Sequence, residues 1–80
     1  MERVEIDANL KKVFCELFQM TPDQINYEST PDTIEGWDSM AQIRIIASIE
    51  EEFDVVISPE QQGDMLTFEL IGDITEELVN

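Results

Sequence analysis

Apolar residues recur along this chain at the spacing of amphipathic α-helices. Over residues 6–19 and again over residues 39–53, they fall three or four positions apart, so each segment presents one apolar stripe. The same pattern follows Thr67, which is the expected N-cap of a last helix. The stripes consist of Leu10, Val13, Phe14, Leu17 and Phe18; of Met40, Ile43, Ile46, Ile49 and Phe53, widened by Ile45 and Ala47; and of Phe68, Ile71, Ile74 and Leu78.

Capping signals predict two shorter elements. The segments "TPDQ" (residues 21–24) and "SPEQ" (residues 58–61) each place a capping hydroxyl before a proline, with a glutamine three positions after the hydroxyl. The first is expected to form a single turn, and the second to start a short helix that Gly63 ends. Residues 54–57, "DVVI", have a strand-like composition but no pairing partner, so we expect an extended link.

A long connection is expected between the first two long helices. Residues 26–37, "NYESTPDTIEGW", contain Pro31 and Gly36, which disfavour a continuous helix. Ile25, Ile34 and Trp37 are its expected anchors to the core. A loop of this length in a small domain is often functional.

Length and composition fit one small globular domain. The chain has 80 residues, of which 42% are hydrophobic, enough for a compact core but not for a cleft with its own walls. We expect residues 1–80 to form a single all-α domain, a small four-helix bundle. Three main helices and one short helix would pack together, with the long loop between the first and second helices.

The net charge limits which partners the chain can bind, and the cysteine content indicates its cellular compartment. Four Lys+Arg against nineteen Asp+Glu give a net charge of −15, which argues against nucleic acid and anionic membranes as partners and favours a monomer. The charge fits attraction to basic partners, although acids that only maintain solubility would give the same value. The single cysteine, Cys15, excludes an internal disulfide, and we therefore expect a cytoplasmic protein.

The chain lacks the residues of the common catalytic and metal sites. There is no histidine, and nucleophilic serine catalysis needs a base. No G-x-S-x-G motif, glycine-rich phosphate loop, zinc-ligand spacing or EF-hand loop occurs. The sequence therefore predicts neither an enzyme nor a metal protein.

One serine stands at a distinctive position, in "GWDSMAQ", residues 36–42. Ser39 and Gln42 have the spacing of a capping box, or else Asp38 is the cap and Ser39 the first helical residue. In either case the hydroxyl lies at the positive end of a helix dipole, which favours an anion such as a phosphate. The residues alone thus favour a cap and also identify a suitable position for a phosphoryl group.

The segment "GWDSMAQIRIIASIEEEF", residues 36–53, resembles the serine motif and second helix of the acyl carrier protein family. The acidic composition and helix order are compatible with that family over nearly the whole chain. The resemblance implies a carrier, in which a phosphopantetheinyl transferase moves 4′-phosphopantetheine from coenzyme A onto Ser39. The thiol of this arm, rather than Cys15, would then carry an acyl or aminoacyl group as a thioester to loading and processing enzymes.

The resemblance also implies a partner surface on the second helix. Met40 replaces the usual leucine, and Ala41 and Arg44 stand where carriers of the fatty-acid type tend to have acids. Arg44 reverses a charge on this surface, which opposes a fatty-acid role. The segment "GWDS" is more similar to stand-alone carriers of specialised pathways, or to polyketide and peptide-synthetase carriers. The implied partner-recognition residues are Asp38, Met40, Ile43, Arg44, Ala47, Glu50 and Glu51.

Two other functions remain possible from the sequence. A non-enzymatic acidic adaptor or inhibitor would use the net charge of −15 to bind a basic protein surface, and it would need no modification. A small hydrolase using Ser39 is disfavoured because the chain offers no positioned base. The identity of the cargo is not determined by these residues.

Overall fold

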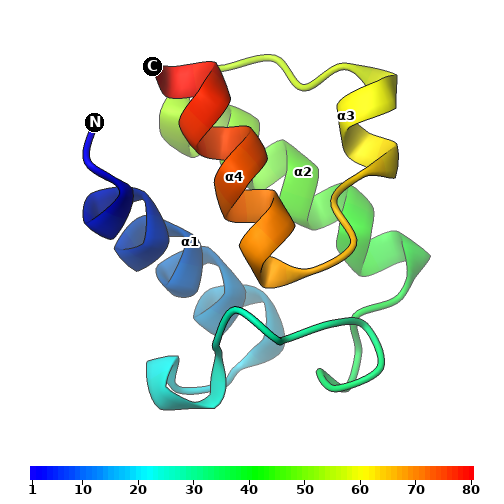
Figure 1. Cartoon of the computed structure of the whole chain (residues 1–80). Coiled ribbons are helices and arrows are strands. Elements are labelled where there is room, and N and C mark those ends of the chain that lie inside the picture. Colours follow the sequence, from blue (N-terminus) through cyan, green and yellow to red (C-terminus); the bar gives the residue numbers. More distant parts are fainter.

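The structure is a computed structural model that describes all 80 residues, and it consists of helices and loops without a strand (Figure 1). The predicted all-α class, with three main helices and one short helix, is confirmed. The elements in chain order are α1 (Arg3–Phe18), the 3₁₀ turn η1 (Pro22–Gln24), α2 (Ser39–Phe53), α3 (Pro59–Gly63) and α4 (Phe68–Val79).

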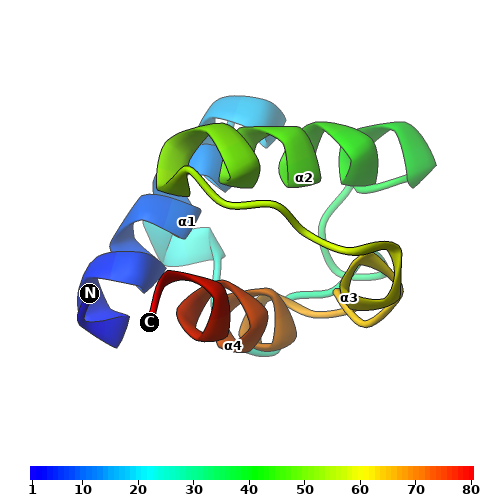
Figure 2. The same ribbon diagram turned by 90° about the horizontal axis from the view of Figure 1, so that it is seen from above.

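The helices are arranged around α1, which packs against both α2 and α4. Figure 2 shows α2 and α4 on opposite sides of the bundle, with the short α3 at the end where α2 begins. The long loop between η1 and α2 crosses the bottom of the bundle in Figure 1. No helix combines the length and the apolar character needed to cross a membrane.

Most helix boundaries follow their local capping signals. Thr21, Ser58 and Thr67 are the N-caps of η1, α3 and α4. Residues 55–57 form a link without helix or strand, as expected, but Asp54 is the left-handed C-cap of α2 and not part of an extended segment. The first helix, however, begins at Arg3 and not near residue 6, because Glu2 and Glu5 form a capping box at its start. Glutamate is not among the preferred capping residues, so sequence reasoning started this helix too late.

The core is one cluster of fourteen buried apolar side chains with Phe14 among its largest. The ring of Phe14 meets those of Trp37 and Phe68 edge-on, each at 5.2 Å between centroids. Such pairs add about 0.5–1.5 kcal/mol to the free energy gained by burial. One aromatic side chain of α1 thereby joins the long loop to α4. The cluster comprises Ile6, Leu10, Phe14, Ile25, Ile34, Trp37, Ala41, Ile45, Ile46, Ile49, Ile57, Met65, Phe68 and Ile71.

The long loop is fixed to the bundle at several points. Ile25, Ile34 and Trp37 are at most 4% exposed, which confirms the predicted anchors. Ser29 is also buried, and its carbonyl oxygen accepts a hydrogen bond from the backbone N–H of Phe68 at 2.9 Å. The loop therefore holds a defined path up to the first residue of α2.

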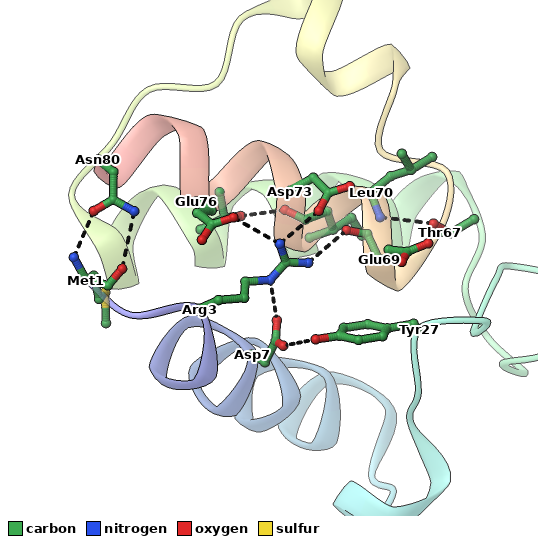
Figure 3. A network of polar contacts seen from close by, with 12 residues as sticks. Met1, Arg3, Asp7, Tyr27, Thr67, Glu69, Leu70, Asp73, Glu76 and Asn80 are labelled. Atoms are coloured by element: carbon green, nitrogen blue, oxygen red, sulfur yellow. Dashed lines mark hydrogen bonds and ion pairs between the residues drawn. The ribbon is translucent and has the colours of Figure 1, made fainter.

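A single guanidinium joins α1 to α4 through several carboxylates (Figure 3). Arg3 donates to Asp7 at 2.9 Å, to Asp73 at 2.8 Å, to Glu76 at 3.2 Å and to the carbonyl oxygen of Glu69 at 3.3 Å. Partial burial alone would lower the pKa of Arg3, but the hydrogen bonds to Asp7 and Asp73 outweigh it and the pKa lies above its usual value. Arg3 therefore stays charged and relieves repulsion between the two helices.

Tyr27 extends this network from the long loop. Its hydroxyl donates to Asp7, and its ring centre lies 5.7 Å from the guanidinium carbon of Arg3. The hydrogen bond to Asp7 raises the pKa of Tyr27 above its ordinary value. The loop, α1 and α4 are thus linked on this side by polar contacts as well as by the core.

The Arg3 side chain also explains a glycine within α4. A Cβ atom added to Gly72 would lie 2.4 Å from Nη2 and 3.0 Å from the guanidinium carbon of Arg3. Glycine inside a helix costs about 1 kcal/mol relative to alanine. Glycine at position 72 therefore lowers the helix propensity of α4 relative to alanine, but it leaves the space that the Arg3 guanidinium occupies.

We predict that Gly72→Ala couples strongly to Arg3. In an Arg3→Ala background the substitution should stabilise the fold by about 1 kcal/mol through helix propensity. With Arg3 present, the gain should vanish or reverse, giving an interaction free energy of about 1 kcal/mol or more. Urea unfolding of the four proteins, followed by circular dichroism, measures it.

Gly63→Ala provides the matched control, because a Cβ atom at Gly63 has nothing within 4 Å. Its effect on stability should be the same with and without Arg3. Equal effects of Gly72→Ala in both backgrounds would contradict the proposed packing.

Candidate functional site

Asp38, rather than Ser39, caps α2. One carboxylate oxygen of Asp38 accepts a hydrogen bond from the backbone N–H of Ala41 at 2.9 Å, and its carbonyl oxygen accepts from the N–H of Gln42 at 2.9 Å. Ser39 is the first residue with helical geometry. Of the two arrangements that the sequence allowed, the Ser39–Gln42 capping box is therefore wrong and the Asp38 cap is correct.

The side chain of Gln42 does not cap α2 but forms hydrogen bonds to two other segments. Its carbonyl oxygen accepts a hydrogen bond from the indole N–H of Trp37 at 2.6 Å, and its amide donates to the carbonyl oxygen of Met65 at 3.1 Å. A buried indole N–H without a partner would be costly. Gln42 thus ties the end of the long loop and the segment before α4 to the start of α2. Sequence reasoning missed this role because it depends on a contact 23 residues away.

Gly36 allows the chain to turn before the site. Its φ of +92° lies in the region that only glycine adopts without strain. The turn is followed at once by Trp37, whose buried ring is the anchor, and by the Asp38 cap. Three consecutive residues therefore determine where Ser39 lies.

The hydroxyl of Ser39 is exposed and takes part in no hydrogen bond. The backbone N–H groups of Ser39 and Met40, in the first turn, also have no acceptor. Unpaired N–H groups at a helix start create a positive potential that favours a phosphate. No base contacts the hydroxyl, so this serine is suited to receive a group from another enzyme and not to act alone.

The other serines differ from Ser39. Ser29 is buried, and its hydroxyl accepts from the backbone N–H of Asn26 at 3.0 Å. The Ser58 hydroxyl accepts from the N–H of Gln61 at 3.2 Å and caps α3. Ser48 is half-buried within α2. Ser39 is the one serine that is both exposed and free of hydrogen bonds.

A groove of about 570 Å³ runs beside Ser39, between the start of α2, the end of α3 and the segment that leads to α4. Its lining combines apolar side chains with carboxamides, which suits a linear ligand of methylene and amide groups. Among the lining side chains, Ile43 is 62% and Leu66 is 61% exposed. The lining includes Pro31, Trp37, Ile43, Gln62, Met65 and Leu66.

The side of α2 that faces solvent differs from the sequence expectation. Met40 and Ile43, which the periodicity assigned to the core stripe, are each 62% exposed. Ala41, which stands where carriers of the fatty-acid type tend to have an acid, is buried at 8% exposure. The helix holds more apolar residues than one face can bury, and burial falls on the side that packs against α1, formed by Ala41, Ile45, Ile46 and Ile49.

The predicted partner residues therefore fall into two groups. Met40, Ile43, Arg44, Ala47 and Glu51 are exposed on the outward side of α2. The remaining two predicted residues are carboxylates that form hydrogen bonds within the fold. Asp38 caps α2, and Glu50 accepts a hydrogen bond from the backbone N–H of Ile57 at 2.9 Å.

We predict unequal stability effects of alanine substitution for the two residues at the helix start. Asp38→Ala removes the cap and should lower the free energy of unfolding by about 1 kcal/mol. Ser39→Ala removes a hydroxyl without a partner and should change it by less than about 0.5 kcal/mol. Thermal unfolding of the unmodified proteins tests this, and a larger loss for Ser39→Ala would restore the serine as the cap.

Comparison with known families agrees with this geometry. Residues 8–78 match the family model described as "Phosphopantetheine attachment site", which covers α2, α3 and most of α1 and α4. Members of this family are non-catalytic carriers to which 4′-phosphopantetheine is covalently attached. The chain therefore belongs to the phosphopantetheine-attachment family, as a carrier of the acyl carrier protein type.

Proposed function

We propose that 4′-phosphopantetheine is attached to the hydroxyl of Ser39 and that residues 1–80 act as one carrier domain. The observation that supports this most directly is the exposed, unbonded hydroxyl at the positive end of α2. The neighbouring groove adds support because its apolar and carboxamide lining suits a pantetheine chain.

The attachment needs little chemistry from this chain. The Ser39 oxygen forms a bond to the β-phosphorus of coenzyme A, the bond from that phosphorus to 3′,5′-ADP breaks, and the hydroxyl proton passes to a base of the transferase. The N–H groups of Ser39 and Met40 supply donors for phosphodiester oxygens. Once attached, the arm supplies a thiol that holds cargo as a thioester.

The resulting function is an acyl or aminoacyl carrier that presents its cargo to loading and processing enzymes. No base contacts Ser39, which argues against a hydrolase. The adaptor alternative rests on the net charge of −15 alone and needs no modification of Ser39. The single cysteine supports a cytoplasmic location, and the net charge of −15 supports a monomer. Arg44 argues against a fatty-acid role, and the resemblance of "GWDS" supports a specialised pathway.

The proposal predicts one modification at one serine. Apo protein incubated with coenzyme A, Mg²⁺ and a broad-specificity phosphopantetheinyl transferase should gain the mass of one phosphopantetheinyl group. Ser39→Ala should gain nothing while remaining folded. Intact-mass spectrometry is the measurement.

Ser48→Ala is the matched control, because it removes another unbonded hydroxyl from the same helix and should be modified like the wild type. If the wild-type mass stayed unchanged while the transferase modified a known carrier, the proposed function would be wrong. If the Ser39→Ala variant were modified, the attachment site would be a residue other than Ser39.

A further inference from the structure

The first three turns of α2 have an unusual charge pattern for this chain. Residues 39–49, "SMAQIRIIASI", contain no acid, although nineteen of the 80 residues are Asp or Glu. Arg44 is the only charged residue among them. The exposed side chains here, apart from Ser39, are Met40, Ile43, Arg44 and Ala47, which we call the outward face.

Arg44 has no ionic partner within the molecule. All three salt bridges of the structure belong to Arg3. The positions three and four residues away on the helix, where an acid would pair with Arg44, hold Met40, Ala41, Ala47 and Ser48. The fold therefore makes no use of this cation.

The acids at the two ends of the outward face do not neutralise it. Asp38 binds the backbone N–H of Ala41, and Glu50 binds that of Ile57. Glu51 remains exposed, nearly two helical turns beyond Arg44. The centre of the outward face is thus apolar with one positive charge, and its complement is an apolar surface that carries a negative charge.

Arg44 and Ser39 lie on different flanks of α2. Ser39 lines the groove toward α3, together with Ile43 and Leu66. Arg44 lines a separate groove of about 410 Å³ on the side of the α1 C-terminus, together with Phe18, Glu35 and Asp38, although neither carboxylate lies within 4.0 Å of its guanidinium. Because Arg44 points away from the serine's groove, an anion that meets it belongs to a protein covering the helix and not to the phosphates of coenzyme A.

We propose that the phosphopantetheinyl transferase covers the outward face with an apolar surface and sets an acidic side chain against Arg44. This inference rests on the proposed attachment at Ser39. Arg44 is five residues from Ser39, or about 7.5 Å along the helix axis. An enzyme that reaches the serine hydroxyl therefore covers Arg44 within an interface of ordinary size.

The test is the kcat/KM for modification by the transferase of the organism that makes this chain. Arg44→Glu should lower kcat/KM by about tenfold or more, and Arg44→Gln by about threefold, while Arg44→Lys stays close to wild type. The ratio between wild type and Arg44→Glu should shrink when salt rises from about 0.05 M to about 0.5 M, since salt screens the pair.

Lys12→Glu is the matched control, because it changes the net charge equally at an exposed position of α1. It should alter kcat/KM by no more than about twofold. An equal loss for Lys12→Glu would assign the effect to net charge and overturn the inference. An Arg44→Glu carrier that reacts as fast as wild type, or faster, would also overturn it, because the face would then meet a neutral or basic surface.

The two proposals fail in different ways. With excess transferase, wild type and Arg44→Glu should both reach complete modification, and their circular dichroism spectra should match. A wild type that is never modified would contradict the attachment at Ser39. A fully modified Arg44→Glu with unchanged kcat/KM would contradict the acidic contact alone.

Discussion

The burial of Trp37 is the contact on which the geometry of the site depends. Its ring packs edge-on against Phe14, at the centre of the core, and its indole N–H is held by Gln42 in the second turn of α2. The helix start is thereby fixed from both sides, through the loop before it and through the helix itself. Because Phe14 also contacts Phe68, the interactions that hold α1 against α4 also position Ser39.

The few cations of this acidic chain have distinct uses. Arg3 gathers carboxylates of α1 and α4, and Gly72 leaves the space that its guanidinium occupies. Arg44 has no such partner and faces solvent among apolar side chains. Part of the negative charge is likewise structural, since Asp38 and Glu50 each bind a backbone N–H. Net charge alone therefore describes the surface of α2 poorly.

Local signals were enough to predict most elements of the fold. Hydroxyl caps and prolines placed η1, α3 and α4, and the serine motif identified the start of α2. The contacts of Arg3 with Gly72 and of Gln42 with Met65 join residues far apart in sequence, which no local pattern reports. Periodicity also assigned Met40 to the core, because helical spacing alone does not tell which side of an apolar helix meets its neighbour.

The division of labour between Asp38 and Ser39 has a consequence for a modified protein. If the serine were the cap, its hydroxyl oxygen would have to stabilise the helix, and esterification would put about 1 kcal/mol of capping free energy at risk. Asp38 takes the cap instead, through a hydrogen bond from the N–H of Ala41 to its carboxylate, so esterification of Ser39 uses no atom of the cap. The N–H groups of Ser39 and Met40 remain available to a phosphodiester. Stability and modification thus depend on adjacent but separate side chains, so α2 can start at the same residue in the unmodified and the modified carrier.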